Sequence, residues 1–291
     1  MKMLNPVKKV AAIHDLSGFG RASLTVVIPI LSRMGTQVCP LPTAVLSTHS
    51  KFKDFHFVDM TTQLQSIIDH WKKLNLSFDA IYSGFLGSHE QIEIVRNFIH
   101  DFRRDNQWVV VDPVLGDDGK IYAPLSKAHV TEMQGLIPEA DVITPNLTEA
   151  ALLLDKPYPK RISISSIKEW VVELSDKGPE TVVVTSVPEG RRKNQTAVIA
   201  YNRKDQRFWK VSCNYLPANY PGTGDAFASV VVGSLLQGDS LPMALDRAVR
   251  FTSMGVRATF GYDYNTDEGI LLERILDTLD SPAQISTYEL I

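Results

Sequence analysis

The sequence of 291 residues has few cysteines and no excess of charge of either sign. Its two cysteines, Cys39 and Cys213, match no CxxC or Cys/His spacing, which argues against a disulfide framework and against a zinc site. Lys and Arg number 30 against 33 Asp and Glu, and the formal net charge is −3. This balance gives no electrostatic basis for binding nucleic acid or an acidic membrane surface.

Long hydrophobic runs are also missing. The most apolar stretch, Ala226 to Leu236, is too short to cross a bilayer. The first apolar run, Val10 to Ile13, ends at His14 and Asp15 and therefore lacks the length of a signal-peptide core. We expect a soluble, cytoplasmic protein.

Two common nucleotide-binding motifs are incomplete or absent. The chain has no GxxxxGK[ST] P-loop. The segment Gly18-Phe19-Gly20 begins like a dinucleotide fingerprint, but Ser23 stands where the third glycine is needed. An NAD-dependent enzyme is therefore a weak hypothesis.

What the sequence does contain is an alternation of short apolar runs and amphipathic helical patterns. This alternation is typical of parallel strands covered by helices on both faces. We predict one α/β domain, residues 1–291, with a mostly parallel central sheet, a late hairpin and two closing helices. The expected strands are 10–13, 80–82, 109–111, 141–143 and 181–184, the hairpin is 195–212, and the helices are 225–237 and 242–258.

Small, acidic and hydroxyl residues follow each predicted strand. Ligands of doubly wound sheets bind beyond the carboxyl ends of the strands, so these residues are expected to meet at one edge. Loops favour such residues in any case, and the grouping matters more than any single position. The candidates are Asp15, Ser83 to Gly87, Asp112 to Asp117, Thr144 to Glu149, and Thr185 with Ser186.

The sharpest motif is Gly222-Thr223-Gly224-Asp225, directly before an apolar helix. Two glycines around a small residue allow backbone N–H groups to point into one concavity at the positive end of the helix dipole. Asp225 could simply cap the helix. A carboxylate beside an anion site repels phosphate, however, which favours a role in accepting a proton from an attacking hydroxyl.

Together these segments resemble the ribokinase-like superfamily, and within it the pyridoxal and pyridoxamine (vitamin B6) kinases. Gly222-Thr223-Gly224-Asp225 resembles the family's anion hole and base. The other segments that carry the resemblance are Asp112-Pro113-Val114-Leu115-Gly116-Asp117, Thr144-Pro145-Asn146-Leu147-Thr148-Glu149, Pro40 to Ser50 and Ser83-Gly84-Phe85-Leu86-Gly87-Ser88.

The resemblance implies ATP-dependent phosphorylation of a hydroxymethyl group on pyridoxal, pyridoxamine or pyridoxine, by a homodimer without a separate lid domain. It implies Mg²⁺ as the metal, with K⁺ as a candidate second cation. Asp225 would be the base and Gly222, Thr223 and Gly224 the anion hole. The implied ATP-binding residues are Asp112, Thr144, Asn146, Glu149, Thr185 and Ser186; the metal residues are Asp112, Asp117 and Glu149; and the substrate residues are Asp15, Thr43, Ser50, Phe85 and Asp225.

Departures from the family pattern keep other functions open. Asn219-Tyr220 stands where sugar kinases carry Asp-Thr, which disfavours a sugar substrate. The loop Asp15-Leu16-Ser17-Gly18 is similar to that of hydroxymethylpyrimidine kinases, which makes this pyrimidine the first alternative substrate. A non-catalytic nucleotide or vitamin sensor is the alternative from another class, although a sensor needs no base at Asp225.

Several candidates also have simple structural interpretations. Asn146 and Glu149 have the spacing of a helix cap, and Phe85 could be a core anchor. For His14 and His49 we expect structural histidines with satisfied hydrogen bonds, because the transfer needs only one base.

Overall fold

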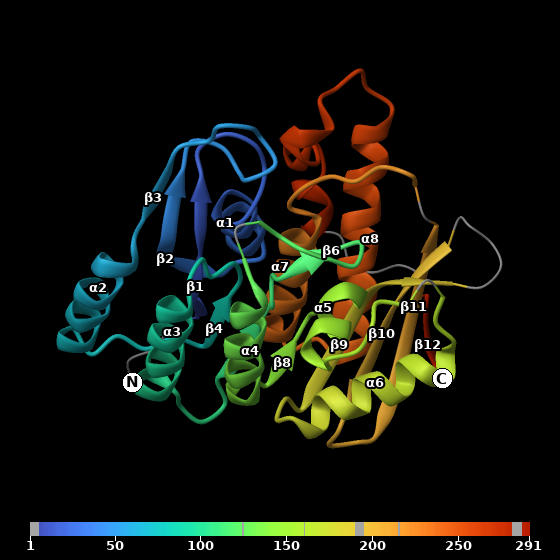
Figure 1. Cartoon of the computed structure of the whole chain (residues 1–291), viewed down its shortest axis with the longest axis horizontal. Helices are drawn as coiled ribbons and strands as arrows, with labels where there is room; N and C mark the ends of the chain where they lie inside the picture. Colours follow the sequence, from blue (N-terminus) through green and yellow to red (C-terminus); the bar gives the residue numbers. More distant parts are fainter. Residues whose placement is uncertain (1–5, 124, 160, 190–194, 215, 281–286) are drawn as a thin grey trace.

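The computed structural model describes residues 6–123, 125–159, 161–189, 195–214, 216–280 and 287–291. Its centre is one twisted sheet that runs through the whole molecule (Figure 1). The ten strands, in spatial order, are β12 (Tyr288–Leu290), β11 (Arg207–Asn214), β10 (Gln195–Asn202), β9 (Thr181–Pro188), β8 (Val142–Ile143), β5 (Trp108–Val111), β4 (Ala80–Ser83), β1 (Lys9–Ser17), β2 (Gln37–Leu46) and β3 (Phe57–Asp59).

The middle of this sheet is parallel and its margins are antiparallel. Strands β9, β8, β5, β4, β1 and β2 pair in parallel. Strand β3 at one margin, and β10 to β12 at the other, pair antiparallel. The predicted mostly parallel α/β fold is therefore confirmed, and so is the hairpin, which forms β10 and β11.

Helices cover both faces of the sheet. One face packs against α2 (Thr61–Lys73), α3 (His89–Phe102), α4 (Lys127–Leu136), α5 (Leu147–Leu153) and α6 (Ile164–Asp176). The other face packs against α1 (Leu24–Arg33), α7 (Thr223–Gln237) and α8 (Leu241–Phe260). Short 3-10 helices lie at Ile137–Glu139, Thr266–Glu268, Leu272–Arg274 and Leu276–Asp280.

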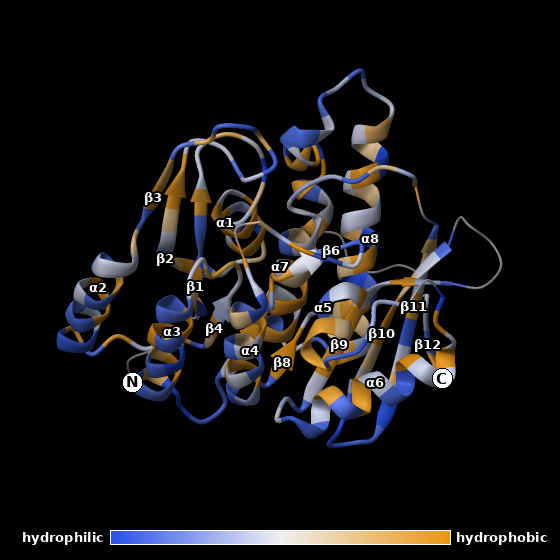
Figure 2. Cartoon of the chain, in the orientation of Figure 1, coloured by the Kyte–Doolittle hydropathy of each residue, from blue (hydrophilic) through white to orange (hydrophobic). Residues whose placement is uncertain are grey.

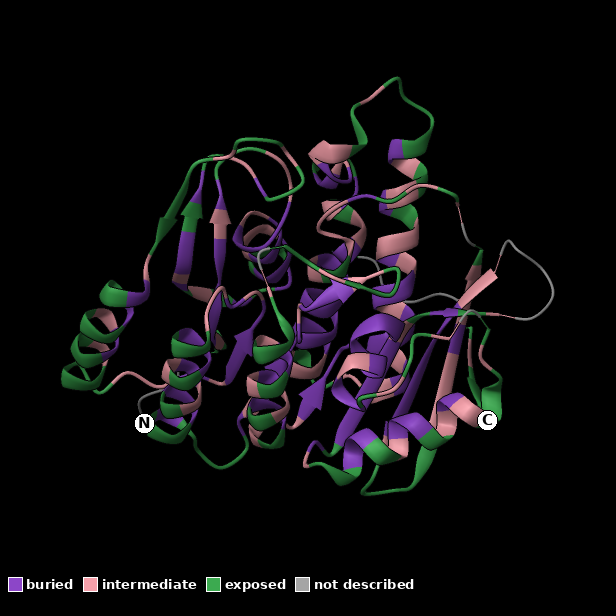
Figure 3. Ribbon diagram, in the orientation of Figure 1, coloured by how far each residue is buried: buried purple, intermediate pink, exposed green. Residues whose placement is uncertain are grey.

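The apolar runs of the strands supply both cores because alternate side chains point to opposite faces. In β1, Ala11 and Ile13 belong to one core, whereas Val10 and Ala12 belong to the other. The hydrophobic residues concentrate on the central strands and the inward faces of the helices (Figure 2), and these are the buried parts of the chain (Figure 3). Among the described residues, no helix is long and apolar enough to cross a membrane.

Five of the described strands lie outside the predicted set. Strand β2 is the most instructive, because Pro40 and Pro42 within it are unusual for a strand. Proline is tolerated where its missing N–H faces an unpaired edge, and β3 pairs only with Ala44 to Leu46 of β2. The others are the short edge strands β3 and β12 and a small separate hairpin, β6 (Gly116–Asp117) with β7 (Lys120–Ile121).

Apart from the β6–β7 hairpin, the described strands belong to one sheet, so the expectation of no separate lid domain is confirmed. Strands from near both ends of the chain, β1 and β12, share that sheet. This supports the proposal that residues 1–291 form a single domain.

Candidate active site

The glycine turn lies where α7 begins. Gly222 has a positive φ of 78°, and a Cβ at this position would overlap the carbonyl oxygen of Arg21, so only glycine fits. A Cβ at Gly224 would meet no atom within 4 Å. The first N–H groups of a helix have no partner within the helix, so those at the start of α7 are available to an anion.

Asp225 follows directly, in the first turn of α7. Its Oδ2 accepts a hydrogen bond of 2.9 Å from the backbone N–H of Ser23. The pKa of Asp225 is raised to about 6, chiefly by burial. The hydrogen bond from Ser23 lowers this pKa, and the charge of Asp15 raises it. A carboxylate with this pKa can accept a proton near neutral pH.

His14 on β1 lies beside Asp225, with its Nδ1 3.9 Å from Oδ1 of the carboxylate. The ring packs edge-on against Tyr82, with 4.4 Å between ring centroids. Burial lowers the pKa of His14 to about 3, so the imidazole is neutral. A hydrogen bond with the backbone of Tyr82 acts in the opposite direction, and the effect of burial is the larger of the two. For His49, whose Nε2 lies 2.6 Å from the carbonyl oxygen of Asp267, the expectation of a satisfied histidine is confirmed.

Asp112 and Glu149 form the acidic part of the site. Asp112 follows β5 and is buried; burial, and then the charge of Asp225, raise its pKa to about 8. Burial and the charge of Asp112 raise the pKa of Glu149 well above its usual range. Mutual repulsion of this kind favours a bound cation.

The helix-cap interpretation of Asn146 and Glu149 is confirmed. The Glu149 backbone N–H donates to Asn146 Oδ1 at 2.9 Å, and Glu149 Oε2 accepts from the Asn146 backbone N–H at 2.8 Å. Glu149 Oε1 accepts from the backbone N–H of Leu115 at 3.1 Å. Each carboxylate oxygen thus accepts one backbone hydrogen bond, which fixes the orientation of the Glu149 side chain.

The donor set fits Mg²⁺, which is held in proteins by one or two carboxylates, water and substrate phosphates. Asp112 provides a hard oxygen ligand, with Glu149 behind it. Within the described residues, no group of three or more His, Cys, Asp or Glu side chains forms an all-protein cage. Asp117 is half-buried in the β6–β7 hairpin, where its Oδ1 accepts from the Asp118 backbone N–H at 2.9 Å.

The remaining nucleotide candidates lie at the ends of β8 and β9. Thr144 is buried, and a hydrogen bond from its side chain lowers the pKa of Asp112, against the larger effect of burial. Thr185 pairs with Asn146 across the strand ends. Ser186 is exposed and adopts a positive φ of 57°.

The substrate candidates are brought together only in part. The Thr43 hydroxyl donates to the Phe85 carbonyl oxygen at 3.1 Å, so the ends of β2 and β4 meet. Asp15 is buried and accepts hydrogen bonds from the hydroxyls of Ser17 and Ser23. Ser50 lies exposed in the loop after β2.

Sequence reasoning missed three residues around the site. Ser23 donates to Asp225 and to Asp15. Lys51 Nζ lies 3.2 Å from Oδ1 of Asp267 and 3.5 Å from the carbonyl oxygen of Asn219, next to the glycine turn. Arg21 joins the first loop to residues 264–273. The sequence offers one indication of their role: Arg21 and Ser23 closely follow the loop Asp15 to Gly18, and Lys51 directly follows the segment Pro40 to Ser50.

A mostly parallel sheet, a glycine turn at the start of α7 and a carboxylate directly after that turn place the chain among the ribokinase-like kinases, as the motifs predict. The family model for phosphomethylpyrimidine kinase matches residues 20–269. The chain therefore belongs to the phosphomethylpyrimidine kinase family.

Similar proteins have been solved. The chain is 59% identical to a Bacteroides thetaiotaomicron protein, provisionally designated a phosphomethylpyrimidine kinase, with a TM-score of 0.96 and 99% of each chain covered. A second crystal form of that protein, with pyridoxal, covers 98% of this chain and 100% of the other. Pyridoxal kinase from Lactobacillus plantarum is 31% identical, with a TM-score of 0.85 and coverage of 94% and 97%. Pyridoxal kinase from Arabidopsis thaliana is 28% identical over 86% of this chain and 83% of its own.

Proposed function

We propose that this protein transfers the γ-phosphoryl group of ATP to the hydroxymethyl group of a vitamin B6 compound: pyridoxal, pyridoxamine or pyridoxine. The observation that carries the proposal is Asp225, a base with a pKa of about 6 in the first turn of α7, directly beside the open glycine turn. Two comparisons support the substrate class: the similar Bacteroides protein was crystallised with pyridoxal, and the Lactobacillus plantarum and Arabidopsis thaliana relatives are pyridoxal kinases.

In the proposed reaction, Asp225 orients the hydroxymethyl group and accepts its proton as the oxygen attacks the γ-phosphorus. The bond from that phosphorus to the bridging oxygen breaks, and ADP leaves. The backbone N–H groups of Gly222, Thr223 and Gly224 would stabilise the charge on the transferring oxygens, as donors fixed in place before the reaction do.

Mg²⁺, when bound, would neutralise the phosphate charge, with Asp112 as ligand and Glu149 and Asp117 reaching it through water. The nucleotide would contact the ends of β8 and β9 through Thr144, Asn146, Thr185 and Ser186. The position of Thr144 supports this placement, because its hydroxyl interacts with Asp112, the proposed metal ligand.

The ring of the substrate would lie between the first two loops of the sheet edge, against Phe85, with Asp15, Thr43 and Ser50 as hydrogen-bonding candidates. We further propose a cytoplasmic homodimer, for which the motif resemblance is the support. K⁺ remains the candidate second cation.

Phosphorylation of hydroxymethylpyrimidine is the second candidate, because the matching family model carries the phosphomethylpyrimidine kinase description. It uses the same base and the same anion site on a different nitrogen heterocycle. The pyridoxal-containing relative favours the B6 compounds.

The decisive experiment is an ATP-consumption assay of the purified protein with each B6 compound and with hydroxymethylpyrimidine, compared by kcat/KM. Higher kcat/KM with a B6 compound supports the proposal. A preference for the pyrimidine keeps the chemistry and replaces the substrate, and turnover of none of them contradicts the kinase assignment.

A further inference from the structure

Ser23, between β1 and α1, has a backbone conformation that serine rarely adopts. Its φ is 53° and its ψ is −130°, a combination that is unfavourable for residues with a Cβ and that persists only where surrounding contacts enforce it. In this conformation the backbone N–H donates to Oδ2 of Asp225 at 2.9 Å, and the hydroxyl donates to Oδ1 of Asp15. Ser23 thus contacts two carboxylates at once: Asp225, the proposed base, and Asp15, a proposed substrate-binding residue.

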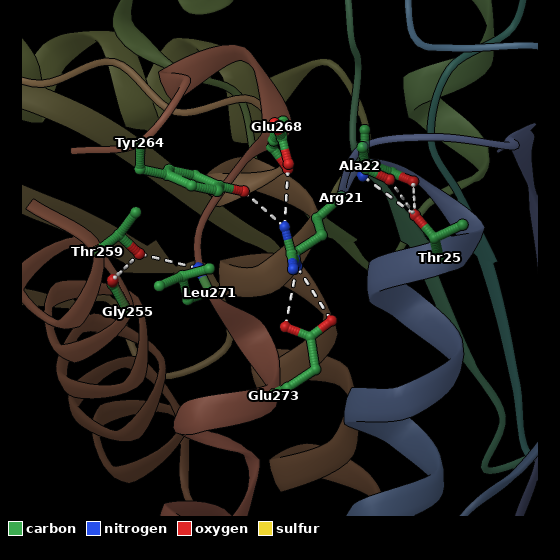
Figure 4. Close-up of polar contacts among 10 residues, drawn as sticks. Arg21, Ala22, Thr25, Gly255, Thr259, Tyr264, Glu268, Leu271 and Glu273 are labelled. Atoms are coloured by element: carbon green, nitrogen blue, oxygen red, sulfur yellow. Dashed lines mark hydrogen bonds and ion pairs between the residues drawn. The ribbon is translucent and has the colours of Figure 1, made fainter. Parts of the chain in front are cut away.

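Arg21, two positions earlier, makes the contacts that fix this loop (Figure 4). Its Nε lies 2.9 and 3.1 Å from the two carboxylate oxygens of Glu273. Its Nη1 donates to the hydroxyl of Tyr264 at 2.6 Å and to the carbonyl oxygen of Glu268 at 3.3 Å. Its backbone N–H donates to the same carbonyl oxygen at 3.0 Å.

The partners of Arg21 are themselves anchored to the helices of the site. Thr259, near the end of α8, accepts from the backbone N–H of Leu271 and donates to the carbonyl oxygen of Gly255, both at 2.8 Å (Figure 4). The carbonyl oxygen of Arg21 also abuts Gly222, where a Cβ would overlap it. The loop is therefore held between the 264–273 segment and the glycine turn before Asp225.

We propose that Arg21 and Ser23 are positioning residues for the phosphoryl transfer, an inference that rests on the proposed function. Arg21 holds the loop against residues 264–273, and this keeps Ser23 in the strained conformation that aims its N–H at Asp225. The bond uses Oδ2 and leaves Oδ1, which lies 3.9 Å from Nδ1 of His14, for the acceptor hydroxyl. Neither residue touches the reacting atoms.

The first experiment compares crystal structures and kinetics of R21A and R33Q with the unchanged protein. Arg33, half-exposed on α1, pairs with Asp280 away from the glycine turn, so R33Q is the matched loss of an arginine ion pair. In R21A we expect the Ser23 N to Asp225 Oδ2 contact to open. The expected kcat falls on the order of tenfold to a hundredfold, as for a misplaced reacting group, while KM for ATP changes by less than about twofold.

R21K is made in parallel, because it keeps the positive charge but cannot contact Glu273 and Tyr264 with one planar group. If R21A does not fold, R21K decides the question by the same two measurements. R33Q should keep both the contact and kcat. A Ser23 to Asp225 contact that stays at 2.9 Å in R21A or R21K overturns the inference.

The second experiment asks whether Arg21 acts through the backbone of Ser23. S23G and S23A both remove the hydroxyl, but only glycine adopts a positive φ without strain. In the R21A or R21K background, the variant with S23G should have a severalfold higher kcat than the variant with S23A. Equal kcat values would contradict a role through Ser23 and leave Arg21 as a residue of general stability.

These tests separate the inference from the proposed function. If the unchanged protein phosphorylates none of the B6 compounds, the proposed function fails. The distance between Ser23 and Asp225 in the crystals of the Arg21 variants still shows whether Arg21 positions this carboxylate.

Discussion

The Nδ1 atom of His14 lies 3.9 Å from the Oδ1 atom of Asp225, yet the imidazole is completely buried and neutral. A protonated histidine at this distance would lower the pKa of the carboxylate. The neutral ring instead contributes to the burial that raises the pKa of Asp225 to about 6. His14 thus helps to keep Asp225 a base of near-neutral pKa without supplying a charge.

We predict that kcat rises with pH through a midpoint near pH 6, because Asp225 accepts a proton only when it is ionised and its pKa is about 6. Activity should fall about tenfold for each pH unit below this midpoint. The measurement is kcat at saturating ATP and acceptor from pH 5 to 9. A profile without an acid limb above pH 5 would exclude Asp225 as the titrating base.

D15N should move this acid limb to lower pH. The charge of Asp15 raises the pKa of Asp225, and the neutral amide removes that repulsion. H14L is the matched control, since it replaces a neutral ring beside the same carboxylate with an apolar side chain. Its acid limb should remain near that of the unchanged protein. A shift of the acid limb to higher pH in H14L would show that the histidine carries positive charge, because a nearby positive charge lowers the pKa of a carboxyl group.

D225N should abolish most turnover and leave the nucleotide site in place. Loss of a general base reduces rates by about 10²- to 10⁴-fold, whereas ATP binding depends on other residues. The check is kcat together with calorimetric binding of ATP. D239N makes the same change of charge just past the opposite end of α7 and should retain kcat. Near-normal turnover in D225N would contradict its assignment as the base.

G222A should destabilise the protein more than G238A. Both glycines lie at ends of α7 with positive φ, 78° and 89°, so both substitutions carry a backbone cost of about 1–2 kcal/mol. A Cβ at position 238 meets nothing within 4 Å, whereas one at 222 overlaps the Arg21 carbonyl oxygen. The measurement is the free energy of unfolding of each variant from urea titration. Equal losses in G222A and G238A would show that the loop around Arg21 moves to accommodate the added Cβ at no cost in stability.

Local patterns in the sequence identify much of the fold. The apolar β-branched runs of β1, β4, β5 and β9 are recognisable because these strands are buried on both faces. Strand β2 is not, because it contains two prolines, which are acceptable only because the edge of β2 that faces away from β1 is unpaired at those positions. Residues that depend on pairing partners far along the chain leave no local pattern.

The sequence alone determines the chemistry that the site can carry: the glycine turn, Asp225 after it, and the acids after β5 and β8. Only the tertiary structure decides how those groups are tuned. Ser23 reaches Asp225 across 202 positions of the chain, and burial among β1, β4 and α7 leaves His14 neutral. Hydrogen bonds and pKa values depend on distances in space and on the exclusion of water. Local sequence patterns predict neither of these two quantities.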